Sequence, residues 1–172
     1  MFKLPVAEKI ERVKFLKDVS TRFFKAEKFD KAFKIYTKIA HFFSSKDVRN
    51  NFAEEDDTLT TYRDALDELD AMAVVNRTNL AVVCLKRGAN EDCIKHCDEA
   101  LKVNHKHIKA LFLKGRALCS EAEYKDSIQV FEDLLEFEPE HAEAQRELKK
   151  TKDMLAAYEA KIKRMAQMMF KV

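Results

Sequence analysis

The sequence predicts an all-α protein that repeats one helix–turn–helix unit along the chain. Only 2 of the 172 residues are glycine and only 2 are proline, which leaves little material for hairpins and tight loops. Hydrophobic residues make up 47% and charged residues 36% of the sequence, a balance typical of helices with one buried and one solvated face. A recurring spacing of small and large residues then favours a repeat array over an ordinary helical bundle.

The clearest copy of the unit spans 108–139, where Gly115 and Ser127 are small and Phe131 is large. Small residues allow two helices to cross closely, and a large residue fills the space beside the crossing. A shift of 34 positions toward the N-terminus aligns these three residues with Ala81, Cys93 and Cys97. A further shift of 34 positions plus a 27-residue insertion aligns them with Ser20, Ala32 and Tyr36. A period of about 34 residues is that of the tetratricopeptide repeat, or TPR. We therefore predict three TPR units within a single domain at 6–172.

Repeat one is predicted over 6–45. Its first helix, 6–25, and its second helix, 29–43, each carry an apolar stripe at helical spacing. The first stripe comprises Val6, Ile10, Val13, Phe15, Leu16, Val19 and Phe23, and the second comprises Phe29, Ala32, Phe33, Tyr36, Ile39 and Ala40. The polar run at 46–57 predicts a loop that begins the 27-residue insertion.

The rest of the insertion is predicted to add helical turns to the first helix of repeat two. That repeat spans 58–104, with Asp57 or Thr58 as the candidate N-cap, and repeat three spans 107–139. A last helix at 140–170 follows. Its N-terminal half is expected to cover the apolar face of the terminal repeat, while its far end projects.

Several classes of function find no support in the residues. No run approaches the ~18 apolar residues of a membrane span. The four cysteines match no disulfide framework, so we expect a reducing compartment, the cytoplasm or the nucleus. Cys93 and Cys97 flank His96, but both cysteines fall on core positions of the repeat, so we expect buried small hydrophobes rather than metal ligands.

Catalysis and nucleic-acid binding are not expected either. The sequence contains no histidine–carboxylate–nucleophile set on a plausible face, and two glycines cannot form a glycine-rich phosphate loop. We therefore predict neither an enzyme nor a cofactor. The formal net charge is only +2, and few aromatic residues are expected beside the basic positions, which disfavours a nucleic-acid partner.

The chain resembles the TPR domain of the FKBP-type immunophilin co-chaperones in FLKDVSTRFFKAEKFDKAFKIYTKIA, NLAVVCLKRG, IKALFLKGRA, the place of the insertion and the closing Met169-Phe170. The resemblance covers nearly the whole chain. It implies a right-handed superhelical solenoid whose first helices line a concave groove. It also implies a partner, the acidic C-terminal tail of heat shock protein 90 or a related chaperone. The prolyl-isomerase domain of that family is not expected here, because no segment is rich in strand signals.

In that family, a clamp of five basic and amide residues holds the terminal carboxylates of the tail. Carried over by position, Lys17, Asn79 and Lys109 match the clamp. Thr21 stands where the family has asparagine, and Leu113 where it has arginine or lysine. Leucine donates no hydrogen bond to a carboxylate, and the loss of one such contact weakens binding by ~1.5–3 kcal/mol. The resemblance thus implies an incomplete clamp, with Thr21 as a weaker donor.

The surroundings of the clamp are predicted to be basic. Lys14, Lys25 and Lys86 are expected to face the groove, Arg116 to replace the missing cation one turn beyond position 113, and Phe112 to form an apolar wall. A groove of one sign raises the local concentration of an acidic peptide. The competing interpretation is that these are ordinary lysine-rich solvated helix faces.

Two further interpretations are kept. In one, the clamp has decayed, and the domain is a scaffold that contacts a folded partner through its convex face or its last helix. In the other, the segment 154–172 binds calmodulin or a membrane surface, since it interleaves basic residues with methionines and aromatics. The resemblance points to calmodulin as well. For this segment we favour the ordinary end of a capping helix.

Overall fold

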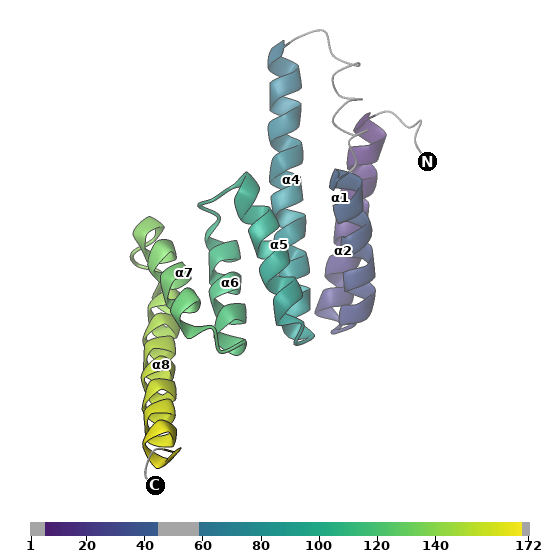
Figure 1. The fold of residues 1–172 in the computed structure, drawn as a ribbon. Coiled ribbons are helices and arrows are strands. Elements are labelled where there is room, and N and C mark those ends of the chain that lie inside the picture. Colours follow the sequence, from purple (N-terminus) through teal and green to yellow (C-terminus); the bar gives the residue numbers. More distant parts are fainter. Residues whose placement is uncertain (1–5, 45–58, 170–172) are drawn as a thin grey trace. The chain divides into compact units, whose positions relative to one another are not determined.

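A computed structural model of the chain describes residues 6–44 and 59–169, and these contain seven helices and no strand (Figure 1). The predicted loop at 46–57 and Phe170 lie outside the described residues. The chain divides into two compact units, Met1–His105 and Lys106–Val172. No helix in the described ranges has both the length and the apolar character needed to cross a bilayer.

The first unit contains α1 (Val6–Lys25), α2 (Phe29–Ser44), α4 (Leu59–Lys86) and α5 (Asn90–Val103). Within it, α1 packs on α2, α2 on α4 and α4 on α5 (Figure 1). The 28 residues of α4 confirm that part of the insertion lengthens the first helix of repeat two. The core is formed by the apolar faces of the first three helices and comprises Val13, Ala32, Tyr36, Ile39, Ala40, Leu80 and Val83.

Phe15 departs from the predicted stripe of α1. Its side chain is 66% exposed, whereas Val13 is 5% exposed. Successive helical residues are rotated by about 100°, so Phe15 lies roughly 200° around the helix from Val13 and faces away from α2. The prediction that Phe15 belongs to the apolar stripe was wrong, because it considered the hydrophobicity of Phe15 but not the direction in which this residue points from the helix axis.

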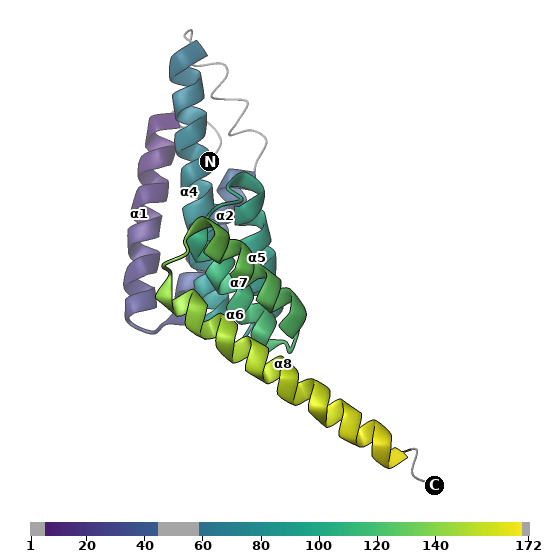
Figure 2. The same cartoon turned by 90° about the vertical axis from the view of Figure 1, so that its left-hand side faces the viewer.

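The second unit contains α6 (Ile108–Ser120), α7 (Tyr124–Phe137) and α8 (Ala142–Met169). α6 packs on α7 and α7 on α8. Ala144 and Thr151 in the N-terminal half of α8 are fully buried, while its side chains from Tyr158 onward are almost all exposed. Figure 2 shows this C-terminal half extending past the ends of α6 and α7.

The turns inside the helix pairs repeat the same backbone conformation. Glu27, Gly88 and Ala122 have φ values of 57°, 73° and 62°, the left-handed region that favours glycine. Gly88 and Ala122 are 34 positions apart, and Glu27 and Gly88 are 61 apart, which is the period plus the 27-residue insertion. The register read from the sequence therefore places equivalent turns at equivalent positions.

The crossing positions of the repeat are buried in all three helix pairs. The small residues at the crossings are 0% exposed: Ser20, Ala32, Ala81, Cys93 and Ser127. Two of the residues beside the crossings, Cys97 and Phe131, are also 0% exposed. At Gly115, a Cβ atom would lie 2.8 Å from the Phe131 ring, so only glycine fits there without movement. Ser127 Oγ donates a hydrogen bond of 2.8 Å to the Gly115 carbonyl and fixes the same crossing.

Candidate functional site

α1 and α4 carry the candidate clamp residues of the first unit. Lys17 is exposed, and its ammonium group has no ion pair among the described residues. Asn79 is half-buried, and its side-chain amide has no hydrogen-bond partner in the described part of the chain. Both groups can therefore donate to a ligand without breaking an existing contact.

The Thr21 hydroxyl is engaged with its own unit. Its Oγ1 donates to the Lys17 carbonyl at 2.8 Å and lies 3.1 Å from the hydroxyl of buried Tyr36. A hydroxyl carries one proton. Because that proton goes to the Lys17 carbonyl, the Tyr36 hydroxyl must be the donor in the contact between the two hydroxyls. In this arrangement Thr21 has no proton left for a carboxylate.

A depression of about 180 Å³ lies next to Lys17, between α1, α2 and α4. It is lined by Val13, Lys17, Ile39, Glu68, Ala71, Met72, Val75 and Asn76. Glu68 is an acidic side chain that the repeat register did not place in the groove, and its carboxylate lies 4.0 Å from the ammonium group of Lys14. The Lys14 ammonium group also lies 3.4 Å from the Glu11 carboxylate. The positive charge of Lys14 is therefore partly neutralised within the protein.

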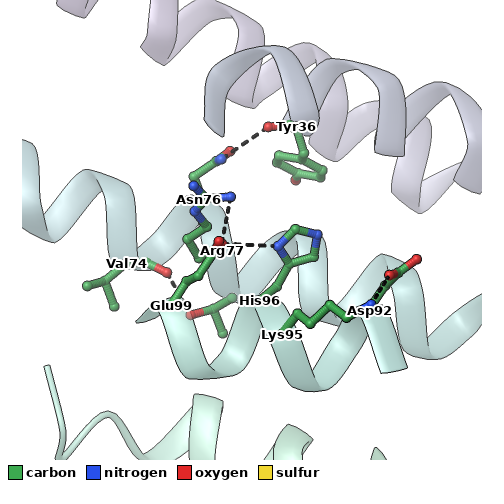
Figure 3. A network of polar contacts seen from close by, with 9 residues as sticks. Tyr36, Val74, Asn76, Arg77, Asp92, Lys95, His96 and Glu99 are labelled. Atoms are coloured by element: carbon green, nitrogen blue, oxygen red, sulfur yellow. Dashed lines mark hydrogen bonds and ion pairs between the residues drawn. The ribbon is translucent and has the colours of Figure 1, made fainter. Parts of the chain in front are cut away.

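A polar network joins α4 to its neighbours (Figure 3). Asn76 Nδ2 donates to the Tyr36 carbonyl of α2 at 3.1 Å, and Arg77 forms an ion pair of 2.8 Å with Glu99 of α5, which also contacts His96. The sequence prediction missed this network. The available signal was two polar residues, Asn76 and Arg77, inside the apolar run of α4.

In the second unit, α6 carries Lys109, Phe112, Leu113 and Arg116. Lys109 and Arg116 are exposed, and neither has an ion pair within the described residues. Phe112 stacks on His141 with ring centroids 5.5 Å apart, and the Arg116 guanidinium lies 5.9 Å from the Phe112 ring. Leu113 is only 6% exposed, so its side chain belongs to the core of this unit.

His107 caps the N-terminus of α6, the helix that carries Lys109. Its Nδ1 accepts a hydrogen bond of 3.2 Å from the Ala110 amide. Burial, with a smaller contribution from the nearby Lys109 charge, holds the pKa of His107 below its usual value of 6.5. Neutral imidazole is the form that can accept this bond, so the cap and the lowered pKa agree.

The cysteine positions follow the repeat prediction. Cys84, Cys93 and Cys97 are 0% exposed, which confirms that they act as small core residues. Burial raises the pKa of the Cys84 thiol to about 11, so this sulfur is a poor nucleophile and a poor metal ligand at neutral pH. Among the described residues, no three histidine, cysteine or carboxylate side chains are placed to share a metal ion.

The fold is that of a TPR domain. The C-terminal TPR-containing domain of an FK506-binding protein from Plasmodium falciparum superposes with a TM-score of 0.75 at 19% identity, over 92% of this chain and 98% of that one. The first TPR domain of Spaghetti (RPAP3), solved bound to the HSP90 peptide SRMEEVD, gives a TM-score of 0.64 at 23% identity, over 85% and 97% of the two chains. No protein-family model matches the chain.

Its sequence is similar to FKBP-type proteins, as the resemblance predicted. FK506-binding protein 59 of Drosophila melanogaster is 24% identical over 98% of the chain, and peptidyl-prolyl cis-trans isomerase FKBP4 of Mus musculus is 26% identical over 83%. The chain spans only 35% and 28% of the length of these two relatives. Its described residues form helical repeats alone, without the strands of an isomerase domain, and the comparisons give no support to a calmodulin site in α8.

Proposed function

We propose that this chain is a protein-interaction domain that binds the acidic C-terminal peptide of heat shock protein 90 or a related chaperone. Within the first unit, Lys17 and Asn79 are the proposed donors to peptide carboxylates; within the second unit, Lys109 and Arg116 are. Leu113 donates nothing, so the clamp is incomplete.

The observation that carries the proposal is the pairing of the basic residues. Six basic side chains are assigned to the peptide, and five of them lack an ion pair within the described residues: Lys17, Lys25, Lys86, Lys109 and Arg116. A carboxylate can approach such a cation without displacing another acid. Elsewhere in the described residues, Arg77, Arg87 and Lys152 are paired at 2.8–3.0 Å, whereas Lys38 and Lys125 are unpaired like the assigned residues. The assigned residues are therefore distinguished by their repeat positions on α1, α4 and α6, and their lack of ion pairs leaves them available to a ligand. RPAP3, whose domain has the same fold, was solved with such a peptide.

The test is a titration of SRMEEVD against the wild type and a Lys17→Glu, Lys109→Glu double variant. Charge-assisted hydrogen bonds contribute ~1.5–3 kcal/mol each, so losing two should raise Kd at least about a hundredfold. A Lys38→Glu, Lys125→Glu variant makes the same change in net charge at exposed lysines outside the site and should retain binding. Equal Kd values for the wild type and the site variant would refute the clamp.

A second candidate function is favoured by the exposed apolar stripe of α8. Tyr158, Ile162, Met165 and Met169 are 45–74% exposed and follow one face of that helix. This is the surface expected of a scaffold whose clamp has decayed and whose last helix contacts a folded partner. Absence of any binding of SRMEEVD to the wild type at millimolar concentration would favour the scaffold.

The burial of Leu113 changes how a decayed clamp could be restored. An arginine at this 6% exposed position would place a charge in the core of the second unit. Thr21→Asn is therefore the better gain-of-binding variant, because position 21 is half-buried at the surface of α1.

The four free cysteines also support our proposal of a reducing compartment, the cytoplasm or the nucleus.

A further inference from the structure

The lengthened N-terminal part of α4 forms one wall of the depression of about 180 Å³ in the first unit. In the repeat register, the first residue of α6, Ile108, corresponds to Val74 of α4, which lies 34 positions earlier. Glu68, Ala71 and Met72 line the depression and precede Val74. They therefore belong to helical turns for which α6 has no equivalent.

Glu68 is the acidic residue of this wall, and it is accessible to a ligand. Its side chain is 54% exposed, and its carboxylate lies 4.0 Å from the ammonium group of Lys14, whose side chain is 52% exposed. An ion pair this open to solvent is weak, so it separates readily and does not remove the effect of the Glu68 charge on a ligand nearby. The depression therefore has a negative charge at its edge, close to the candidate clamp lysine Lys17.

The other walls of the depression favour a neutral side chain. Most of them are apolar, from Val13, Ile39, Met72 and Val75. The volume of about 180 Å³ is below the 300–1,000 Å³ typical of small-molecule pockets and suits one side chain. An acidic side chain placed there would lose water against these walls and would lie near a like charge, and both effects are unfavourable.

We propose that Glu68 is a specificity-determining residue, which excludes an acidic side chain from this depression and so requires a neutral residue next to the terminal residue of the bound peptide. The position follows from Lys17, which lines the same depression and is assigned to a terminal carboxylate. The neighbouring peptide residue is only about 3.8 Å away along the backbone, which places it beside the depression. This preference rests on the proposed peptide-binding function and adds a repulsive element to it, as specific recognition often requires.

The test compares the peptides SRMEEED and SRMEEQD, which have the same shape and differ by one charge at the penultimate position. Isothermal titration of the wild type should give a Kd for SRMEEED about three- to tenfold higher than that for SRMEEQD. In Glu68→Gln, this ratio of Kd values should fall by about two- to fivefold, because the repulsion is gone. Glu68 is exposed, so the variant should keep the circular dichroism spectrum of the wild type.

Glu11→Gln is the matched control. The Glu11 carboxylate lies 3.4 Å from the Lys14 ammonium group, but Glu11 is not among the described residues that line the depression. The control makes the same change in net charge as Glu68→Gln and also releases Lys14 from an acidic partner. It should therefore retain the ratio of Kd values found for the wild type.

The outcomes separate the role of Glu68 from the function on which it rests. If SRMEEVD binds and the ratio is the same in the wild type and Glu68→Gln, the role of Glu68 is refuted. A fall of equal size in Glu11→Gln would refute it as well, because the effect would then come from the release of Lys14. The proposed function would survive both results. If no peptide binds the wild type, the proposed function and the role of Glu68 both fail.

Discussion

Replacement of Gly115 by alanine tests the helix crossing that positions the candidate residues of α6. The added Cβ would lie 2.8 Å from two atoms of the Phe131 ring and 3.0 Å from a third. Phe131 is 0% exposed and also makes an edge contact with Phe112, which lies one turn before Gly115 on the same helix, so the buried ring cannot move freely. α6 or α7 must shift instead.

Two terms of opposite sign set the expected size of the effect. Overpacking of a core costs about 1–3 kcal/mol, and the rigid ring places this case in the upper part of that range. Alanine in a helix interior is about 0.8–1 kcal/mol more favourable than glycine. The net loss in the free energy of unfolding is then ~1–2 kcal/mol, or a fall in Tm of roughly 2–8 °C for a chain of this length.

The assay is urea unfolding followed by circular dichroism at 222 nm. A double-mutant cycle with Phe131→Leu supplies the control, because leucine leaves room for the new methyl group. In that background Gly115→Ala should be neutral or stabilising. If Gly115→Ala alone raised the stability by about 1 kcal/mol, helix propensity would be the only term and the close approach to Phe131 would be refuted.

The remaining predictions concern the same elements. Ser127→Ala removes the buried hydrogen bond to the Gly115 carbonyl and should cost ~1 kcal/mol in urea unfolding, whereas Ser127→Thr should restore the bond only at the expense of packing. The pKa of His107 is lowered in the folded state, so its contribution to the free energy of unfolding is complete above pH 6.5 and is lost as the pH falls through the lower folded pKa. Asparagine at this position still caps α6 but does not titrate. His107→Asn should therefore flatten the plot of unfolding free energy against pH in that window. Cys119 is the partly exposed thiol and should react first with a thiol reagent at pH 8, while Cys84, with a pKa of about 11, should react only on unfolding. A native protein that loses all four thiols at one rate would contradict the buried assignment.

The repeat register was readable from the sequence because the constraint is periodic and local. A crossing that needs a small residue recurs every 34 positions, and Ser20, Ala81 and Gly115 meet that need whatever their chemistry. The apolar stripes likewise follow from 3.6 residues per turn. Phe15 shows the limit of the method, since its hydrophobicity is real but its angular position is wrong for the core.

The polar details of the candidate site could not be read in the same way. The partner of the Asn76 amide is the Tyr36 carbonyl, 40 positions away on another helix, and no local pattern encodes that pairing. The Thr21 proton is taken by a carbonyl on its own helix, which position alone does not reveal. Family position also gave no warning that Leu113 is buried.

Recognition of a terminal carboxylate is the central claim, and one comparison tests it most directly. Isothermal titration of the wild type with SRMEEVD as the free acid and as the C-terminal amide changes only that group. Donation from the unpaired Lys17, Asn79 and Lys109 predicts that the free acid binds at least about tenfold more tightly. Equal affinity of the acid and the amide would show that these side chains do not hold the carboxylate.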